Sequence, residues 1–194
     1  MRNRMFVGVA ILIVALWTAA GAMAQTPTTT TGTAQELGPF TYYNFFSSDG
    51  TTVTGTAQTL GPFTYYNLHS SDGTSTSGSS QELGPFTHYN FNSSGADAGR
   101  TKRSTTTGTS QQLGPFTHYN FSTTGTDRGR FETKTTTGTS QQLGPFTHFN
   151  LQGSDGSSTS GSILELGGTG LWDLTKTEPA EADSDPFGSL WEED

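Results

Sequence analysis

Alternation of apolar and polar residues recurs along most of the chain and predicts β-strands. In the run 40–46, Tyr43 and Phe45 fall on one face, while Phe40 and Tyr42 fall on the other. Across later copies of this run, the Tyr43 position keeps Tyr or Phe and the Phe45 position keeps Phe or Leu, whereas the Tyr42 position changes to His. We therefore expect Tyr43 and Phe45 to face a core and Tyr42 to face solvent.

The alternating runs belong to an internal repeat. The motif Leu-Gly-Pro-Phe-Thr occurs five times, beginning at Leu37, Leu60, Leu83, Leu113 and Leu143. The units that contain it span residues 32–54, 55–77, 78–107, 108–137 and 138–160. Residues 161–174 form a degenerate sixth unit in which Gly168-Thr169 replaces Pro-Phe. Terminal repeats of a stacked array cover its last core layer, so we expect this unit to be a cap.

Each unit carries two turn signals. Asp-Gly, as in Asp49-Gly50, predicts a tight hairpin, and units three and four carry longer segments at this point. Gly-Pro predicts a second turn, or alternatively a bulge within one longer strand that would turn Leu37 and Phe40 inward. The predicted fold class is all-β with about ten to twelve strands in tandem β-hairpin repeats. A solenoid-like stack and a meander or closed barrel both fit.

The two ends of the chain differ from the repeats. Residues 1–24 have a basic start, an apolar run of about 15 residues and a small-x-small end, which predicts a cleaved secretion signal rather than a membrane span. Residues 25–31 form a Thr-rich leader, and 175–194 form an acidic tail that we expect to be disordered. The chain is thus predicted to be secreted (extracellular, cell surface or periplasm), with no membrane span after cleavage.

Composition narrows the function. The 194 residues include 36 Thr, 21 Ser, 25 Gly and 22 aromatic residues, no cysteine, and a formal net charge of −8. The absence of cysteine excludes disulfides and thiol catalysis. Catalysis needs unique residues, whereas nearly every side chain here is duplicated and no nucleophile–base pair stands apart. We therefore expect no enzyme activity and no cofactor.

Two sets of repeated residues are candidates for binding. The first is the position of Tyr42 in each unit, which makes a candidate aromatic ladder for ligand binding: Tyr42, Tyr65, His88, His118 and His148. A row of imidazoles can bind zinc or copper, but tyrosine in two copies favours a solvent-facing ladder without metal. The second is a predicted basic patch in the long segments of units three and four: Arg100, Lys102, Arg103, Arg128, Arg130 and Lys134. In an acidic secreted chain this patch points to polyanionic glycans or the acidic tail, not to nucleic acid.

The repeated Gly-x-Phe-Thr-(Tyr/His)-(Tyr/Phe)-Asn resembles short tandem repeats of uncharacterised secreted bacterial proteins over residues 32–174, and this resemblance implies no activity. The 23-residue period is also similar to that of curli-type amyloid subunits, although a proline in each unit opposes continuous cross-β stacking. We expect an exported, non-catalytic structural or adhesive protein of the cell surface or matrix, with itself as partner through strand edges. The alternative is a secreted module that binds glycan or cell-wall polymer through the aromatic ladder.

Overall fold

The protein is a twelve-stranded antiparallel β-structure. The computed structural model describes residues 27–97, 100–127 and 130–177. Its strands are β1 (Thr28–Leu37), β2 (Phe40–Ser47), β3 (Thr52–Leu60), β4 (Phe63–Ser70), β5 (Ser75–Leu83), β6 (Phe86–Asp97), β7 (Arg100–Leu113), β8 (Phe116–Asp127), β9 (Arg130–Leu143), β10 (Phe146–Gly153), β11 (Ser158–Leu166) and β12 (Thr169–Thr177). Their number and the all-β class confirm the sequence prediction.

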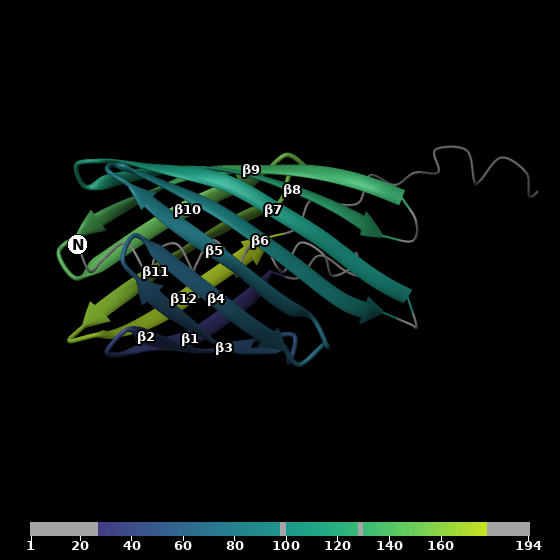
Figure 1. Cartoon of the computed structure of the whole chain (residues 1–194), viewed down its shortest axis with the longest axis horizontal. Coiled ribbons are helices and arrows are strands. Elements are labelled where there is room, and N and C mark those ends of the chain that lie inside the picture. The colour runs from purple at the N-terminus through teal and green to yellow at the C-terminus, as the bar shows by residue number, and fades with distance from the viewer. Residues whose placement is uncertain (1–26, 98–99, 128–129, 178–194) are drawn as a thin grey trace, which may run out of the picture.

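The sheet closes on itself. Each strand pairs with its sequence neighbours, and β1 pairs with β12 over eight positions from Thr28↔Lys176 to Gln35↔Thr169. Figure 1 shows the resulting barrel from the side, with the long strands β6–β9 extending beyond the others at one end. The open stack is therefore wrong, and the barrel alternative is confirmed. Closure leaves no unpaired edge among the twelve strands.

Gly-Pro forms the turns at one end of the barrel, which we call the Gly-Pro end. Leu37 pairs with Phe40 across Gly38-Pro39, and Gly38 has φ +65°. A positive φ at the first central residue, followed by proline, matches a type II′ hairpin. The bulge alternative is wrong, because Leu37 and Phe40 flank a true turn and face outward with 57% and 39% of their surfaces exposed.

Asp-Gly lies at the opposite end, in loops of three residues rather than two. In the first hairpin, Gly50 N donates to Ser47 O and Ser47 N donates to Thr51 O. Gly50 has φ +85°, and the Asp49 carboxylate accepts a hydrogen bond from Thr51 N. This is a type I turn closed by a left-handed glycine. The loop thus reverses the chain while the N–H groups of Ser47, Gly50 and Thr51 all have hydrogen-bond partners.

Alternate residues of every strand point into the barrel and form rings there. Tyr43 and Phe45 are buried, as predicted, with 3% and 0% of their surfaces exposed. The ring at the level of Phe45 consists of Phe45, Leu68, Phe91, Phe121, Leu151 and Leu174, and each member is paired with an inward-facing glycine on a neighbouring strand. Large and small side chains therefore alternate around the interior.

The sixth unit closes the barrel instead of capping a stack, since β12 joins β11 to β1. β12 ends at Thr177, beyond the predicted start of the tail at 175, and β1 starts at Thr28 within the predicted leader. The predicted secretion signal, 1–24, and the rest of the acidic tail, 178–194, lie outside the described residues.

Candidate functional site

The predicted aromatic ladder lies on the outer face of the barrel. Its members stand on the five even-numbered strands from β2 to β10, all at the same level and all exposed: Tyr42, Tyr65, His88, His118 and His148. We call this set the outer band. Phe63 stacks on Tyr65 with ring centroids 6.4 Å apart, and Phe146 stacks on His148 at 6.3 Å. Neighbouring strands place Gln58 and Ser79 beside Tyr65.

The predicted basic patch does not form one outer surface. Arg103 faces outward, but Lys102 and Lys134 stand in the opposite phase of their strands and are half-buried. Arg128 lies outside the described residues, as do the side chains of Arg100 and Arg130. Lys134 pairs with Asp155 at 2.5 Å and donates to Ser157 Oγ at 2.9 Å. Burial opposes ionisation of Asp155, but these partners outweigh it and hold its pKa below the usual value.

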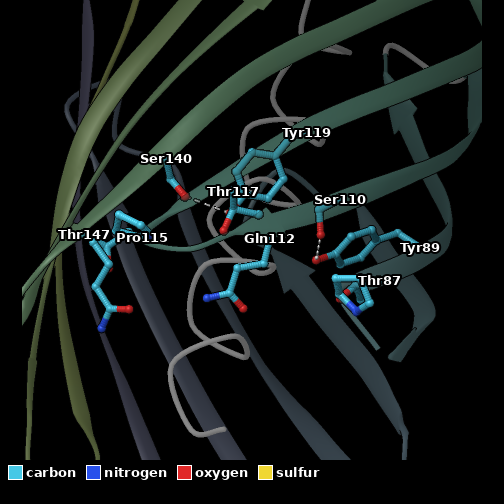
Figure 2. A pocket seen from close by; sticks show the side chains of 11 residues that line it. Thr87, Tyr89, Ser110, Gln112, Pro115, Thr117, Tyr119, Ser140 and Thr147 are labelled. Carbon is cyan, nitrogen blue, oxygen red and sulfur yellow. Dashed lines mark hydrogen bonds between the residues drawn. The ribbon is translucent and has the colours of Figure 1, made fainter. Parts of the chain in front are cut away.

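Inside the barrel, tyrosines of one unit bond to serines of the next. The Tyr66, Tyr89 and Tyr119 hydroxyls lie 3.2, 3.2 and 3.0 Å from the Oγ atoms of Ser80, Ser110 and Ser140, respectively. Figure 2 shows the last two pairs beside Gln112 and Thr117, where they line a cavity of about 40 Å³ near the Gly-Pro end. That volume holds one or two water molecules. Buried hydroxyls are thus satisfied from unit to unit.

The tyrosine–serine pairs are missing where the barrel closes. Ala57 occupies the place of Ser80, and the Tyr43 hydroxyl is buried without a hydrogen-bond partner among the described residues. Trp172 occupies the tyrosine position of unit six, and its Nε1 is also buried and unpartnered within that part of the chain. By the repeat its partner position is Ala34, which carries no polar group. Two orphaned groups therefore lie on β2 and β12, the two strands that flank β1.

Two carboxylates lie above these groups at the Gly-Pro end. Glu36 and Glu165 occupy equivalent positions of β1 and β11, and Gly170 of β12 lies between the strands, paired with both Glu165 and Ala34. Gly170 takes the place of an inward threonine that units one to five all carry, so this sector lacks one side chain of that ring. Glu36 N donates to Gly168 O at 2.9 Å. We call Glu36, Tyr43, Glu165, Gly170 and Trp172 the seam site.

Burial and the charge of Glu36 shift the pKa values of two of these groups. Burial raises the pKa of Glu165 to about 7, and the charge of Glu36 adds to the effect. Burial also holds the pKa of Tyr43 well above its usual value; Tyr66 and Glu36 add to this shift, and Thr41 opposes it. Glu165 Oε1 is buried without a partner among the described residues. Near neutral pH, Glu165 is therefore protonated in a fraction of the molecules.

Stability should fall as pH rises from 5 to 8 because of Glu165. The pKa of Glu165 in the folded state, about 7, lies above the ordinary value of 4.5, so the folded state binds more protons between these two values. This contribution to stability is lost as pH rises through 7. Glu165 is half-exposed, so solvent screening reduces the effect to on the order of 1 kcal/mol. Thermal unfolding of wild type and Glu165→Gln at both pH values tests this. An unchanged pH dependence in the variant would contradict it.

Replacing Ala57 with serine should stabilise the protein. The serine restores the repeat residue and gives the Tyr43 hydroxyl the partner that Tyr66 finds in Ser80. The expected gain in the free energy of unfolding is about 1 kcal/mol, since a buried orphan becomes paired. Chemical denaturation measures it, with Ala34→Ser as the comparison, where the facing group is the Trp172 indole. A loss of stability in Ala57→Ser would show that Tyr43 has no room for this bond.

The seam site was not predicted from the sequence. Its signal is present, because Ala57 and Gly170 depart from residues that the other units repeat. These two substitutions can be interpreted only once the strand pairing is known, because the strand pairing places each tyrosine beside the serine of the following unit. The outer band was easier to find because its residues recur at one position of each unit.

The described residues contain no group of three or more His, Asp or Glu side chains arranged to hold a metal ion. In the same ranges, no helix has the length and apolar character needed to cross a membrane. Comparison of the chain with protein-family models, curated proteins and solved structures gives no match.

Proposed function

We propose that the protein is an exported, non-catalytic adhesive protein of the cell surface or extracellular matrix that binds polysaccharide through its outer band. The observation that carries this proposal is the alignment of exposed aromatic rings on alternate strands from β2 to β10, around about three-quarters of the barrel wall. Strand spacing of about 4.8 Å separates rings on alternate strands by about 10 Å. A chain of sugar rings can therefore contact several rings at once.

The chemistry of the outer band suits sugar rings. Tyr42 and Tyr65 expose 46% and 49% of their surfaces, which leaves ring faces open to the apolar faces of a sugar. Gln58 and Ser79 flank Tyr65 with groups that both donate and accept hydrogen bonds. Each position alone binds weakly, and five linked positions bind a polymer with higher avidity.

A hollow beside the band supports the same proposal. It has a volume of about 350 Å³, lies over β4–β7, and is lined by serine, threonine and asparagine residues together with Arg103. Most of these residues face outward. A guanidinium among neutral hydroxyl and amide groups favours a polysaccharide that carries carboxylate or sulfate groups. Polyanionic glycans are therefore the class that we expect to bind most tightly.

Glycan arrays and pull-down with insoluble polysaccharide test the proposal. Alanine at all five outer-band positions should abolish binding while circular dichroism and the melting temperature change little, because the residues are exposed. The matched control replaces Thr54, Thr107 and Thr137, outward residues of odd-numbered strands, with alanine and should bind normally. A wild-type protein that retains no glycan, or a five-fold variant that binds as well as wild type, would contradict the proposal.

Self-assembly is a second candidate function, favoured by a ring of exposed apolar residues at the Gly-Pro end. The ring, which we call the collar, consists of Leu37, Phe40, Leu60, Phe63, Leu83, Phe86, Leu113, Phe116, Leu143, Phe146 and Leu166. Closure removes the strand edges, so contact between copies would use the collar rather than edge pairing. Electron microscopy and light scattering test it. Serine at Leu60, Leu83 and Leu113 should then abolish any filaments, and a monomeric wild type would rule the candidate out.

A further inference from the structure

We propose that the collar inserts into the surface of a lipid bilayer and holds the barrel upright on it, with the Gly-Pro turns toward the lipid. The inference goes beyond the proposed function, because it concerns the collar and needs no glycan. Three observations carry it: the collar is level and closed, its apolar side chains point outward on all sides, and the wall beside it lacks charged residues.

The turns of the Gly-Pro end form a level rim, because the same backbone hydrogen bond joins each turn to the next. In the first five turns the proline oxygen accepts from an amide of the following hairpin, as Pro39 O accepts from Thr59 N at 2.9 Å. At the sixth turn Gly168 O accepts from Glu36 N at 2.9 Å, so the series closes on the first strand. Each hairpin is therefore offset from the one before by the same step, which the tilt of the strands converts into a level rim. The same bonds leave these oxygens paired, which lowers the cost of taking the turns out of water.

The side chains of the collar point away from the barrel axis. Leu and Phe flank each Gly-Pro turn in the outward phase, and their exposed fractions range from 36% for Phe63 to 57% for Leu37. Exposed apolar side chains gathered in this number mark a contact with a protein or a membrane. Because they point outward around the whole rim, only a partner that surrounds the rim covers all of them. A lipid layer into which the rim sinks does so.

A second copy of the chain covers the collar poorly. Two collars that met end to end would join their Gly-Pro turns and leave the outward Leu and Phe side chains at the edge of the contact. A stable dimer buries about 1,200–2,000 Å², and the turns alone offer little apolar surface toward that area. Glu36, Glu82 and Glu165 stand in the inward phase at the same end, so the contact would also bring like carboxyl groups together. Repulsion between the ionised ones disfavours it.

The wall next to the collar suits the headgroup layer of a membrane. One level further from the turns, units one to five carry Gln on the odd-numbered strands and the Tyr or His of the outer band on the even-numbered strands, with no Asp, Glu, Lys or Arg. Unit six places Leu164 and Leu171 at this level. Amphipathic aromatic rings are favoured at the depth of lipid headgroups. Beyond this level units one to five carry Thr, Ser and Asn, so the rim sinks only into the interface, about 5–10 Å deep.

Flotation with phosphatidylcholine vesicles tests the inference on residues 25–194, since the apolar run of the predicted secretion signal would itself bind lipid. Phe86→Ser combined with Phe116→Ser removes two rings of the collar and should lower the partition coefficient about tenfold. The matched control combines Phe46→Ser with Phe131→Ser. These two rings lie at the opposite end and are more exposed, at 53% and 78%, so the control should bind as wild type does. Circular dichroism and the melting temperature check that both pairs keep the fold.

The charge of the chain predicts how binding depends on lipid and salt. The chain is acidic, with a formal net charge of −8, and the collar consists of Leu and Phe alone. Adding phosphatidylglycerol to the vesicles should therefore not strengthen binding, and high salt should not release the protein.

Labels at single cysteines report the orientation, because the chain has no cysteine of its own. Leu37 of β1 and Leu113 of β7 lie on opposite sides of the collar, six strands apart around the barrel. A nitrobenzoxadiazole label on Leu37→Cys or on Leu113→Cys should shift its emission to shorter wavelength when vesicles are added. The same label on Thr107→Cys, an outward residue further along β7, should not shift.

The variants also separate this inference from the proposed function. The collar pair should keep glycan binding by the outer band. Alanine at the outer band should keep most of the binding to phosphatidylcholine, which carries no sugar.

Four results would overturn the inference. The first is a wild type that does not float with vesicles, and a dimer that depends on the collar would then assign that surface to a second copy. The second is flotation that the collar pair leaves intact. The third is binding that needs anionic lipid and is lost in high salt, which would assign the contact to basic side chains. The fourth is an emission shift at only one of the two collar labels, which would lay the barrel on its side.

Discussion

Replacing Gly108 with alanine should lower the free energy of unfolding by about 2–3 kcal/mol, although the change adds a single methyl group. The new Cβ would lie 2.6 Å from the carbonyl oxygen of Asn120 and even closer to the ring of Phe121 on the paired strand. The ring can rotate only against its neighbours, since Tyr119 stacks on it at 6.3 Å and Tyr89 packs against it at a tilt at 5.4 Å. The backbone oxygen cannot move without breaking the β7–β8 register.

Guanidinium denaturation of Gly108→Ala measures the loss. Thr107→Ala is the matched control, because Thr107 is the adjacent residue of the same strand and faces solvent, so only a change of less than about 1 kcal/mol is expected from strand propensity. Gly138→Ala should behave like Gly108→Ala, since its Cβ would meet the Asn150 carbonyl oxygen and Leu151. If both glycine variants unfold at the wild-type midpoint, the alternation of large and small residues does not hold the interior together.

The sequence predicted the strands and their inner face well because those features are local. Substitutions that keep bulk at Tyr43 and Phe45 identify a buried face whatever the strand pairs with. The glycine ring was missed for the opposite reason. Gly108 begins its unit as a routine repeat residue, and nothing in the sequence near it indicates that Phe121 stands across from it on the next strand.

Two features of the molecule went beyond the sequence-based prediction for different reasons. The basic patch combined residues of both phases: alternation along β7 already separates Lys102 from Arg103, so period-2 reasoning would have divided the set. Closure, by contrast, is not encoded in any local pattern, because it depends on the pairing of the first strand with the last. The degenerate sixth unit predicted the end of the repeat array. It gave no indication that Leu174 pairs with Thr30 of the first strand.

The same reasoning explains why the seam site escaped a search for repeated chemistry. Closure brings the least regular unit, which contains Glu165, Gly170 and Trp172, against the first unit, where Ala34 stands at the serine position. In a repeat protein a function that needs one asymmetric site is expected where the repeat fails. Here the two weakest copies of the pattern lie side by side only because the barrel is closed.

Ending the chain after Leu166 should convert the closed barrel into a protein that aggregates. The truncation removes β12 and with it all the hydrogen bonds that β1 and β11 make to that strand. Both strands then present free edges, rich in Thr in β1 and in Ser in β11, which pair readily with another copy. Gly32, Ala34 and Ile163 also lose the cover of Trp172. We expect thioflavin-T-positive aggregates and loss of the cooperative unfolding transition.

The matched control ends the chain after Thr177, which keeps all twelve strands and removes only residues outside the described part of the chain. It should elute as wild type in size-exclusion chromatography and unfold at the same temperature, so the difference between the two truncations isolates closure. Adding a synthetic peptide of residues 167–177 to the shorter chain should suppress aggregation, because it supplies the missing strand to both edges. A shorter chain that stays monomeric and unfolds cooperatively would mean that eleven strands close without the sixth unit, and the pairing of β1 with β12 would then not be what holds the barrel shut.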